Sequence, residues 1–163
     1  MIPEKLKAAL DEHVAAEMSA AYLYLAMSAD FDTKAYKGFG RWMRVQFREE
    51  LEHALKFVDY MLLRGAPIGW KDAKAPATAY GTPLEAFEAT LAHEQAVTAR
   101  IHNLYRLAGA ENDLATQVFL QWFVTEQVEE EARVAEIVEK VRLTSDRPGS
   151  LLYLDKEFGK RSA

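Results

Sequence analysis

Four long stretches of this chain place apolar residues about every 3.6 positions, and this helical spacing is the strongest constraint on the fold. Proline and glycine, which interrupt helices, gather mainly between positions 67 and 83 and at positions 148–149. No segment shows the alternating pattern of a strand. We therefore expect an all-α protein. The expected helices span about residues 3–31, 36–64, 83–109, 112–143 and 150–160.

Two of the expected helix ends carry specific signals. Gly65 is expected to stop the second helix, because glycine readily takes the conformation that follows a helix end. Thr82 can cap the third helix, Pro83 suits its first position, and Glu85 completes a capping box.

The connection lengths predict how the helices are arranged. The first two helices, and the third and fourth, are joined by short turns and should form antiparallel hairpins. The crossover at residues 66–82 is long. Fully extended it reaches roughly 55 Å, whereas the second helix should span about 42 Å. The pattern predicts a ferritin-like four-helix bundle with one long crossover and a short fifth C-terminal helix.

Composition narrows the class of protein. The 163 residues, 18.4 kDa, suit a single domain over residues 1–163. The net charge of −5 and the pI near 5.4 argue against a nucleic-acid partner. The absence of cysteine excludes disulfides and thiolate-ligated metal sites. Because we find neither a signal-peptide pattern nor a membrane-length apolar run, we expect a cytoplasmic protein with no membrane partner.

A carboxylate interrupts the apolar stripe of each long helix near its middle. The four residues are Glu17, Glu50, Glu94 and Glu130, and His53 lies one turn after Glu50. Mid-height is the same level whether a helix points up or down, so the four carboxylates should meet in one layer of the core. One such residue would usually reach out to solvent, but four together make that explanation improbable.

Four buried negative charges require compensation. No lysine or arginine lies on these stripes near mid-height, and two divalent cations would balance the charge. A ligand set rich in oxygen, with one imidazole, suits iron or manganese better than copper. The three-residue spacing places Glu50 to bridge two metals and His53 to bind one of them.

Four segments carry a resemblance to a known family: "AAEMSAAYLYLAM", "FREELEHA", "HEQAVT" and "WFVTEQVEEEA". Through them the chain resembles bacterial and archaeal non-haem ferritins over nearly its whole length, and the last segment is the most specific. The resemblance implies a ferroxidase centre that uses Fe(II) with O₂ or H₂O₂. It also implies a homo-oligomeric cage of twenty-four subunits with a ferric mineral inside.

The resemblance also implies roles for individual residues. One iron would bind residues of the first two helices: Glu17, Glu50 and His53. The second would bind Glu50, Glu94 and Glu130, with Gln127 nearby. A possible third iron site would use Glu49, Glu126, Glu129 and Glu130, although an acidic run like this is usually a solvated face. Tyr24 would hydrogen-bond near the centre and could lend an electron, or it could be a core tyrosine.

The chain departs from the symmetric di-metal pattern, in which a second Glu-x-x-His motif lies on another helix. Gln127 and Glu130 occupy the corresponding positions, so the second site should hold iron less tightly. We hypothesise that this asymmetry suits a centre through which iron passes. Leu51 stands where bacterioferritin has its haem-ligating methionine, so no haem is expected.

Three other functions remain open from the sequence: a rubrerythrin-like peroxidase, a non-catalytic assembly protein and a DNA-protecting mini-ferritin. The rubrerythrin-like peroxidase would need a second Glu-x-x-His, which is missing. The intact core carboxylates and His53 argue against the assembly protein, and the fifth helix argues against the mini-ferritin. His13, His93 and His102 have no nearby ligand pattern and are interpreted as surface or packing residues. The fifth helix could dock on its own bundle or pack with symmetry mates.

Overall fold

The protein is described by a computed structural model over residues 1–161, so residues 162–163 of the expected domain lie outside the described part. Five helices occur in this part and no strand, which confirms the all-α prediction. They are α1 (Glu4–Thr33), α2 (Lys37–Leu63), α3 (Pro83–Ala110), α4 (Leu114–Thr144) and α5 (Pro148–Phe158). The last begins two residues earlier than expected, because Pro148 occupies its first turn.

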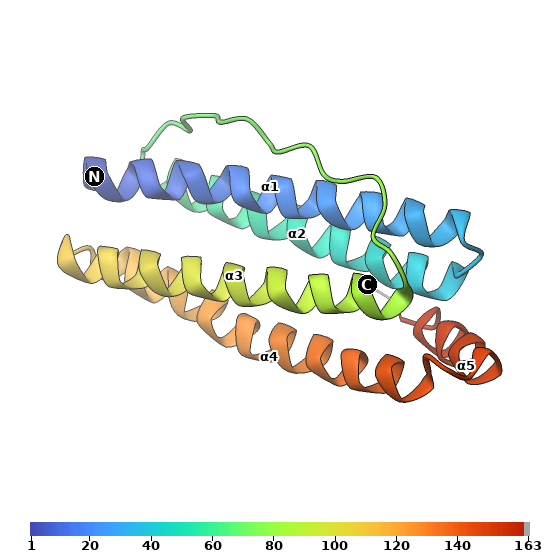
Figure 1. Ribbon diagram of the computed structural model, residues 1–163. Helices are drawn as coiled ribbons and strands as arrows, with labels where there is room; N and C mark the ends of the chain where they lie inside the picture. The colour runs from blue at the N-terminus through green and yellow to red at the C-terminus, as the bar shows by residue number, and fades with distance from the viewer. Residues whose placement is uncertain (162–163) are drawn as a thin grey trace.

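The long helices form two antiparallel hairpins, α1 with α2 and α3 with α4, which pack into a four-helix bundle (Figure 1). The crossover between α2 and α3 runs from one end of the bundle to the other along α1. Three α1 side chains hold the crossover there by accepting hydrogen bonds from its backbone N–H groups. Asp11 accepts from Gly69 at 2.9 Å, Ser19 from Lys74 at 2.9 Å and Asp30 from Tyr80 at 3.2 Å. The expected ferritin-like topology is confirmed.

The predicted capping box at the start of α3 is present. The Thr82 hydroxyl accepts from the Glu85 N–H at 3.3 Å, and the Glu85 carboxylate accepts from the Thr82 N–H at 2.7 Å. Gly65, after α2, has φ of +69°, which glycine adopts without the cost paid by other residues. The two hairpins are also tied together where α2 ends and α4 begins, because Arg64, the C-cap residue of α2, pairs with the α4 N-cap residue Asp113 at 2.8 Å.

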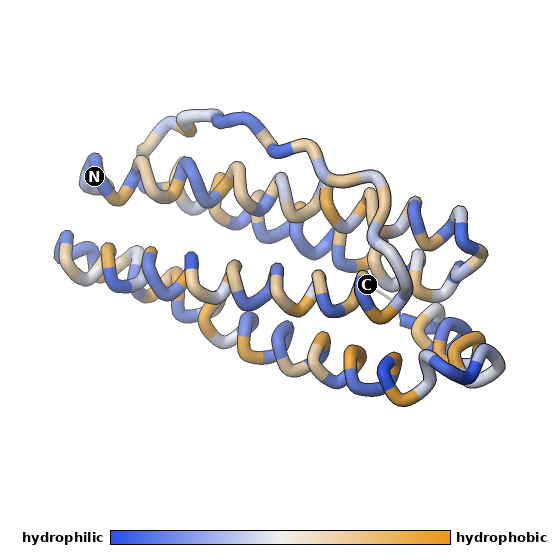
Figure 2. Tube along the Cα trace, viewed as in Figure 1, coloured by the Kyte–Doolittle hydropathy of each residue, from blue (hydrophilic) through white to orange (hydrophobic). Residues whose placement is uncertain are grey.

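The core consists of two apolar clusters with a polar layer between them. One cluster includes Leu6, Leu10, Phe57, Met61, Ile101 and Leu120. The other includes Met27, Phe31, Phe39, Phe87, Val134 and Val141. Along the helices, apolar positions recur between polar ones, as expected for helices with one side packed in a bundle (Figure 2). No helix in the described part of the chain combines the length and apolar character needed to cross a bilayer.

The fifth helix docks on its own bundle, one of the two alternatives expected for it. The Phe158 ring lies 5.6 Å from the Phe39 ring, centroid to centroid, and Leu151 is buried. Asp155 accepts a 2.7 Å hydrogen bond from the Phe39 N–H in the first turn of α2. The opposite side of α5 presents Tyr153, which is 63% exposed.

Docking of α5 depends on the absence of a side chain at Gly38. A Cβ atom added there would lie 1.6 Å from the carbonyl oxygen of Asp155, which is backbone and cannot rotate away. We expect Gly38→Ala to displace α5 and to lower the free energy of unfolding by about 1–3 kcal/mol. Guanidinium unfolding curves measure this change.

Gly149→Ala is the matched control, because a Cβ at Gly149 would meet nothing within 4 Å. Equal stability of the two variants would show that α5 does not need the close approach at Gly38.

Candidate metal centre

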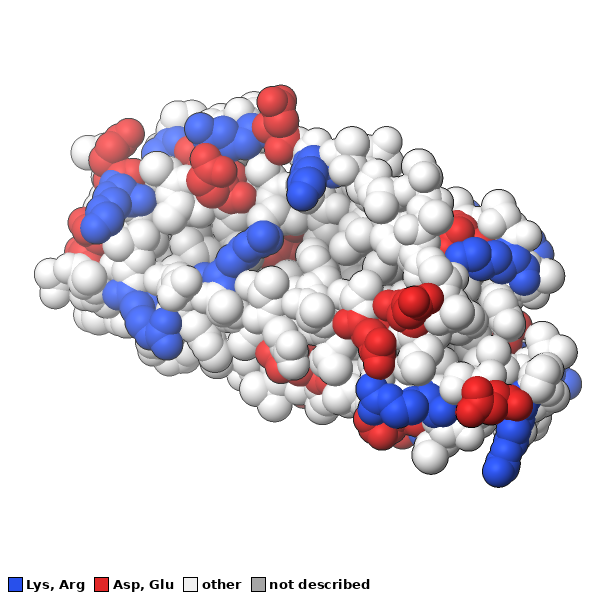
Figure 3. Space-filling model, viewed as in Figure 1, with Lys and Arg blue, Asp and Glu red and all other residues white. Residues whose placement is uncertain are grey.

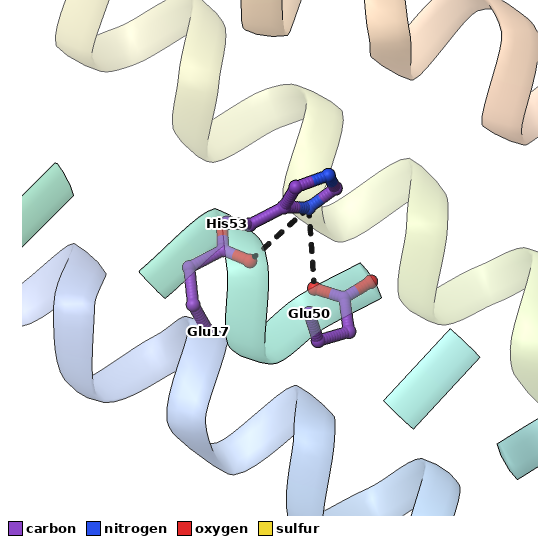
Figure 4. A group of neighbouring side chains, drawn as sticks. All are labelled: Glu17, Glu50 and His53. Carbon is purple, nitrogen blue, oxygen red and sulfur yellow. Dashed lines mark ion pairs between the residues drawn. The ribbon is translucent and has the colours of Figure 1, made fainter. Parts of the chain in front are cut away.

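Helices α1 and α2 bring Glu17, Glu50 and His53 together in the core (Figure 4). His53 Nδ1 lies 3.8 Å from Glu17 Oε2 and 3.7 Å from Glu50 Oε2. One ligand atom from each residue lies within 4.8 Å of the others, a grouping found nowhere else among residues 1–161. Two carboxylates and an imidazole so arranged could hold a divalent cation.

Helices α3 and α4 complete the polar layer with Glu94, Gln127 and Glu130, all buried. The Glu94 carboxylate accepts hydrogen bonds from the Tyr24 hydroxyl and from Gln127 Nε2, the latter at 3.2 Å. Glu130 Oε2 accepts from Gln46 Nε2 at 3.2 Å. In this structure Tyr24 and Gln127 are therefore hydrogen-bond donors that orient the Glu94 carboxylate.

Burial dominates the electrostatics of this layer. Burial, and then the charge of the nearby Glu17 carboxylate, raise the pKa of Glu50 to about 8. Burial and the charge of Glu50 raise the pKa of Glu94 to about 8 as well, and burial raises the pKa of Glu17. For His53, burial lowers the pKa, but Glu50 and then Glu17 outweigh this effect and bring it above its usual range. Cation binding must therefore release protons from the layer.

The compensating charge of Arg133 was not predicted from the sequence. Its Nη1 lies 2.6 Å from Glu130 Oε1. Arg133 lies off the apolar stripe with a side chain 36% exposed, and its long stem carries the guanidinium inward to the buried carboxylate. One of the four core carboxylates is therefore paired with a cation of the chain itself.

His13 was expected to be a surface or packing residue, and it packs in the core against Phe57, but it also makes a contact that was not expected. His13 is buried, and its Nε2 lies 2.6 Å from Glu17 Oε1. Residues four apart share a helix face, so the spacing of His13 and Glu17 on α1 was the signal that could have found this contact. His93 contacts the Tyr24 ring edge-on at 5.7 Å between centroids, as a packing residue does.

The residues expected for a third iron site differ in their exposure and in their partners. Glu49 is half-buried and its Oε2 accepts a 2.6 Å charged hydrogen bond from Arg161. Glu126 is half-buried and Glu129 is exposed. Burial raises the pKa of Glu49, and Arg161 opposes that shift. The third site stays a prediction.

Comparison with known proteins decides the family. The profile described as the ferritin-like domain matches residues 7–144. The chain belongs to the ferritin family. It is 41% identical to a "Bacterial non-heme ferritin" of Bacteroides fragilis over 161 residues, covering 99% of this chain and 100% of that protein. The corresponding ferritin of Staphylococcus saprophyticus is 39% identical, with 99% and 97% covered.

Solved ferritin structures superpose closely on this ferritin chain. An open-pore ferritin from the hyperthermophilic archaeon Archaeoglobus fulgidus matches with a TM-score of 0.98 and 47% identity, covering 99% of this chain and 100% of that one. An engineered closed form of the Archaeoglobus ferritin matches with a TM-score of 0.97 and 47% identity, each chain covered to 99%. The resemblance to non-haem ferritins is confirmed.

The raised pKa values predict how stability depends on pH when metal has been removed by a chelator. Between the ordinary pKa of 4.5 and the folded value of about 8, Glu50 and Glu94 hold protons that the unfolded chain releases. Stability should therefore fall as the pH rises through this window. Thermal unfolding followed by circular dichroism at pH 5.5 and pH 8 measures the effect.

The double variant Glu50→Gln, Glu94→Gln is the control, because an amide cannot titrate in this range. Its unfolding temperature should vary less between the two pH values than that of the unsubstituted protein. An unchanged pH dependence would assign the effect to other groups.

Proposed function

We propose that this chain is an iron-storage ferritin subunit with an intra-subunit ferroxidase centre. The observation that carries this proposal is the buried trio of Glu17, Glu50 and His53, which faces Glu94 and Glu130 in a ferritin bundle. Buried carboxylates without enough cationic partners favour a divalent cation strongly. The relatives named as non-heme ferritins support iron as that cation.

In the proposed reaction two Fe(II) ions bind side by side as substrates. Glu50 bridges them, Glu17 and His53 complete the first site, and Glu94 and Glu130 complete the second. Each ion loses one electron. H₂O₂ takes the pair with two protons to give two water molecules, or O₂ takes the pair with two protons to give H₂O₂. The carboxylates favour the product, because Fe(III) is the harder and more highly charged ion.

The second site should hold iron less tightly than the first. Gln127 presents its Nε2 to Glu94 and thus acts there as a donor, where the symmetric pattern would supply a further ligand. This asymmetry suits iron in transit to the cavity. Anaerobic Fe(II) titration of the metal-stripped protein should resolve one tighter and one weaker ion, and two equally tight, non-exchanging ions would contradict the proposal.

Storage requires assembly. We propose a cage of twenty-four subunits in the cytoplasm that retains the ferric product as a mineral. Large apolar side chains exposed on the single chain, including Leu63, Trp70 and Leu114, fit burial between subunits. The Archaeoglobus relatives are described as open-pore and closed ferritins, which supports a shell. Aerobic Fe(II) addition followed by sizing tests this, and a small oligomer without retained iron would contradict it.

Glu50 is the residue on which both proposed iron sites depend. We expect Glu50→Ala to abolish fast Fe(II) oxidation, because it removes the bridging carboxylate. Stopped-flow absorbance after mixing Fe(II) with oxygenated protein measures the initial rate.

Glu52→Ala is the matched control, since Glu52 is exposed on the same helix two residues away. It should retain the fast phase. If the two variants oxidise Fe(II) equally fast, oxidation does not occur at this centre.

Arg161 bears on the proposed third iron site. It pairs with Glu49 at 2.6 Å and lies over the Trp42 ring, 4.6 Å from its centroid. An iron bound by Glu49 would therefore compete with Arg161 for this carboxylate. We expect Arg161→Gln to strengthen binding of Fe(II) beyond the first two ions per subunit, measured by equilibrium titration.

Lys160→Gln is the control, because Lys160 pairs at the surface with Glu157. Identical titration curves for the two variants would show that Arg161 does not compete with iron at Glu49.

A further inference from the structure

The two carboxylate oxygens of Glu17 face different partners. Oε2 points into the trio and lies 3.8 Å from His53 Nδ1. Oε1 points the other way and lies 2.6 Å from His13 Nε2. Because one oxygen is engaged outside the trio, Glu17 can offer iron mainly the other.

His13 is built into the core at this point. Its side chain is 3% exposed, one turn before Glu17 on α1, and its ring packs edge-on against Phe57 at 4.5 Å between centroids. Nε2 lies at hydrogen-bond distance from Oε1 without the alignment of a full hydrogen bond, and no other hydrogen-bond partner of Nε2 is found in the described part of the chain.

We propose that His13 is a positioning residue for the first iron site: its Nε2–H holds Oε1 of Glu17, and Oε2 is thereby presented to the metal. This inference rests on the proposed function. Groups that hydrogen-bond to a ligating carboxylate fix its orientation and affect metal affinity without touching the metal. His13 is not part of the trio whose ligand atoms converge within 4.8 Å, so it acts through Glu17.

The other side of the His13 ring lines a surface pocket of about 580 Å³ between α1, α3 and the crossover. The pocket lining combines the acidic Glu12 and Asp72 with the basic Lys74 and Arg100. Acidic and basic groups likewise mix over the face of the molecule drawn in Figure 3. The imidazole therefore also separates Glu17 from the pocket, and a replacement must keep its volume to test the donor alone.

Cobalt(II) titration of the metal-stripped, assembled protein tests the proposal, because the visible spectrum of cobalt reports binding without any turnover. His13→Leu removes the donor but keeps an apolar side chain, and it should weaken the first Co(II) by about 10- to 100-fold. His13→Gln can still donate from its amide and should restore most of the affinity. His102→Leu, on α3 away from the trio, is the matched control and should bind as the unsubstituted protein does.

The outcomes separate this inference from the proposed function. If Co(II) binds and Glu50→Ala abolishes binding, the result supports the proposed metal centre. Equal Co(II) affinity of the His13→Leu and His102→Leu proteins would then overturn only the role of His13. If Glu50→Ala leaves Co(II) binding intact, the centre itself is wrong and the inference fails with it.

A second measurement needs no variant and covers the case in which His13→Leu does not fold. Solid-state ¹⁵N NMR of the Zn(II)-loaded, histidine-labelled protein reports the state of each ring nitrogen. We expect His13 Nε2 to remain protonated and free of metal, and His53 Nδ1 to bind it. Loss of the Nε2 proton of His13, or its coordination to zinc, would overturn the positioning role.

Discussion

The burial of four carboxylates in one layer of the bundle is the constraint on which the rest of this structure depends. Ionised carboxylates lose their hydration in a core, and the four have few positive charges beside them: Arg133 pairs with Glu130, and His53, whose pKa is raised, lies beside Glu17 and Glu50. The layer therefore favours either protonation of its carboxylates or the binding of a cation. Its other polar neighbours, Tyr24 and Gln127, donate hydrogen bonds that hold Glu94 in place without neutralising it. A site of this kind is poor for stability and well suited to binding divalent metal.

The surrounding fold accommodates this cost. Two apolar clusters lie on either side of the polar layer. Each of the four long helices therefore packs in an apolar core on both sides of the buried carboxylates. The crossover is fastened to α1, and α5 closes one end of the bundle through Phe158 and Asp155. The docking of α5 also carries the chain to Arg161, which reaches Glu49 beside the layer. The segment that follows α5 thus bears on the proposed third iron site.

Much of the centre could be predicted because helical periodicity converts sequence spacing into shared faces. Glu50 and His53 are three apart, and the structure places them together with Glu17. The same rule applies to His13 and Glu17, which are four apart on α1 and are in contact. Arg133 and Arg161 are a different case. Long side chains reach positions that their place on the helix does not reveal, and Arg161 meets Glu49 only through the docking of α5.

The sequence by itself determined the five helices, their order, the long crossover and the height at which carboxylates enter the core, because these follow from period, turn chemistry and chain length. Only the tertiary structure decided which atoms face one another. The division of Glu17, with Oε2 toward His53 and Oε1 toward His13, depends on side-chain rotamers, and those are selected by packing between α1 and α2. The spacing of His13 and Glu17 along α1 indicates that they can meet, but it does not specify which oxygen turns to which partner, since His53 comes from α2.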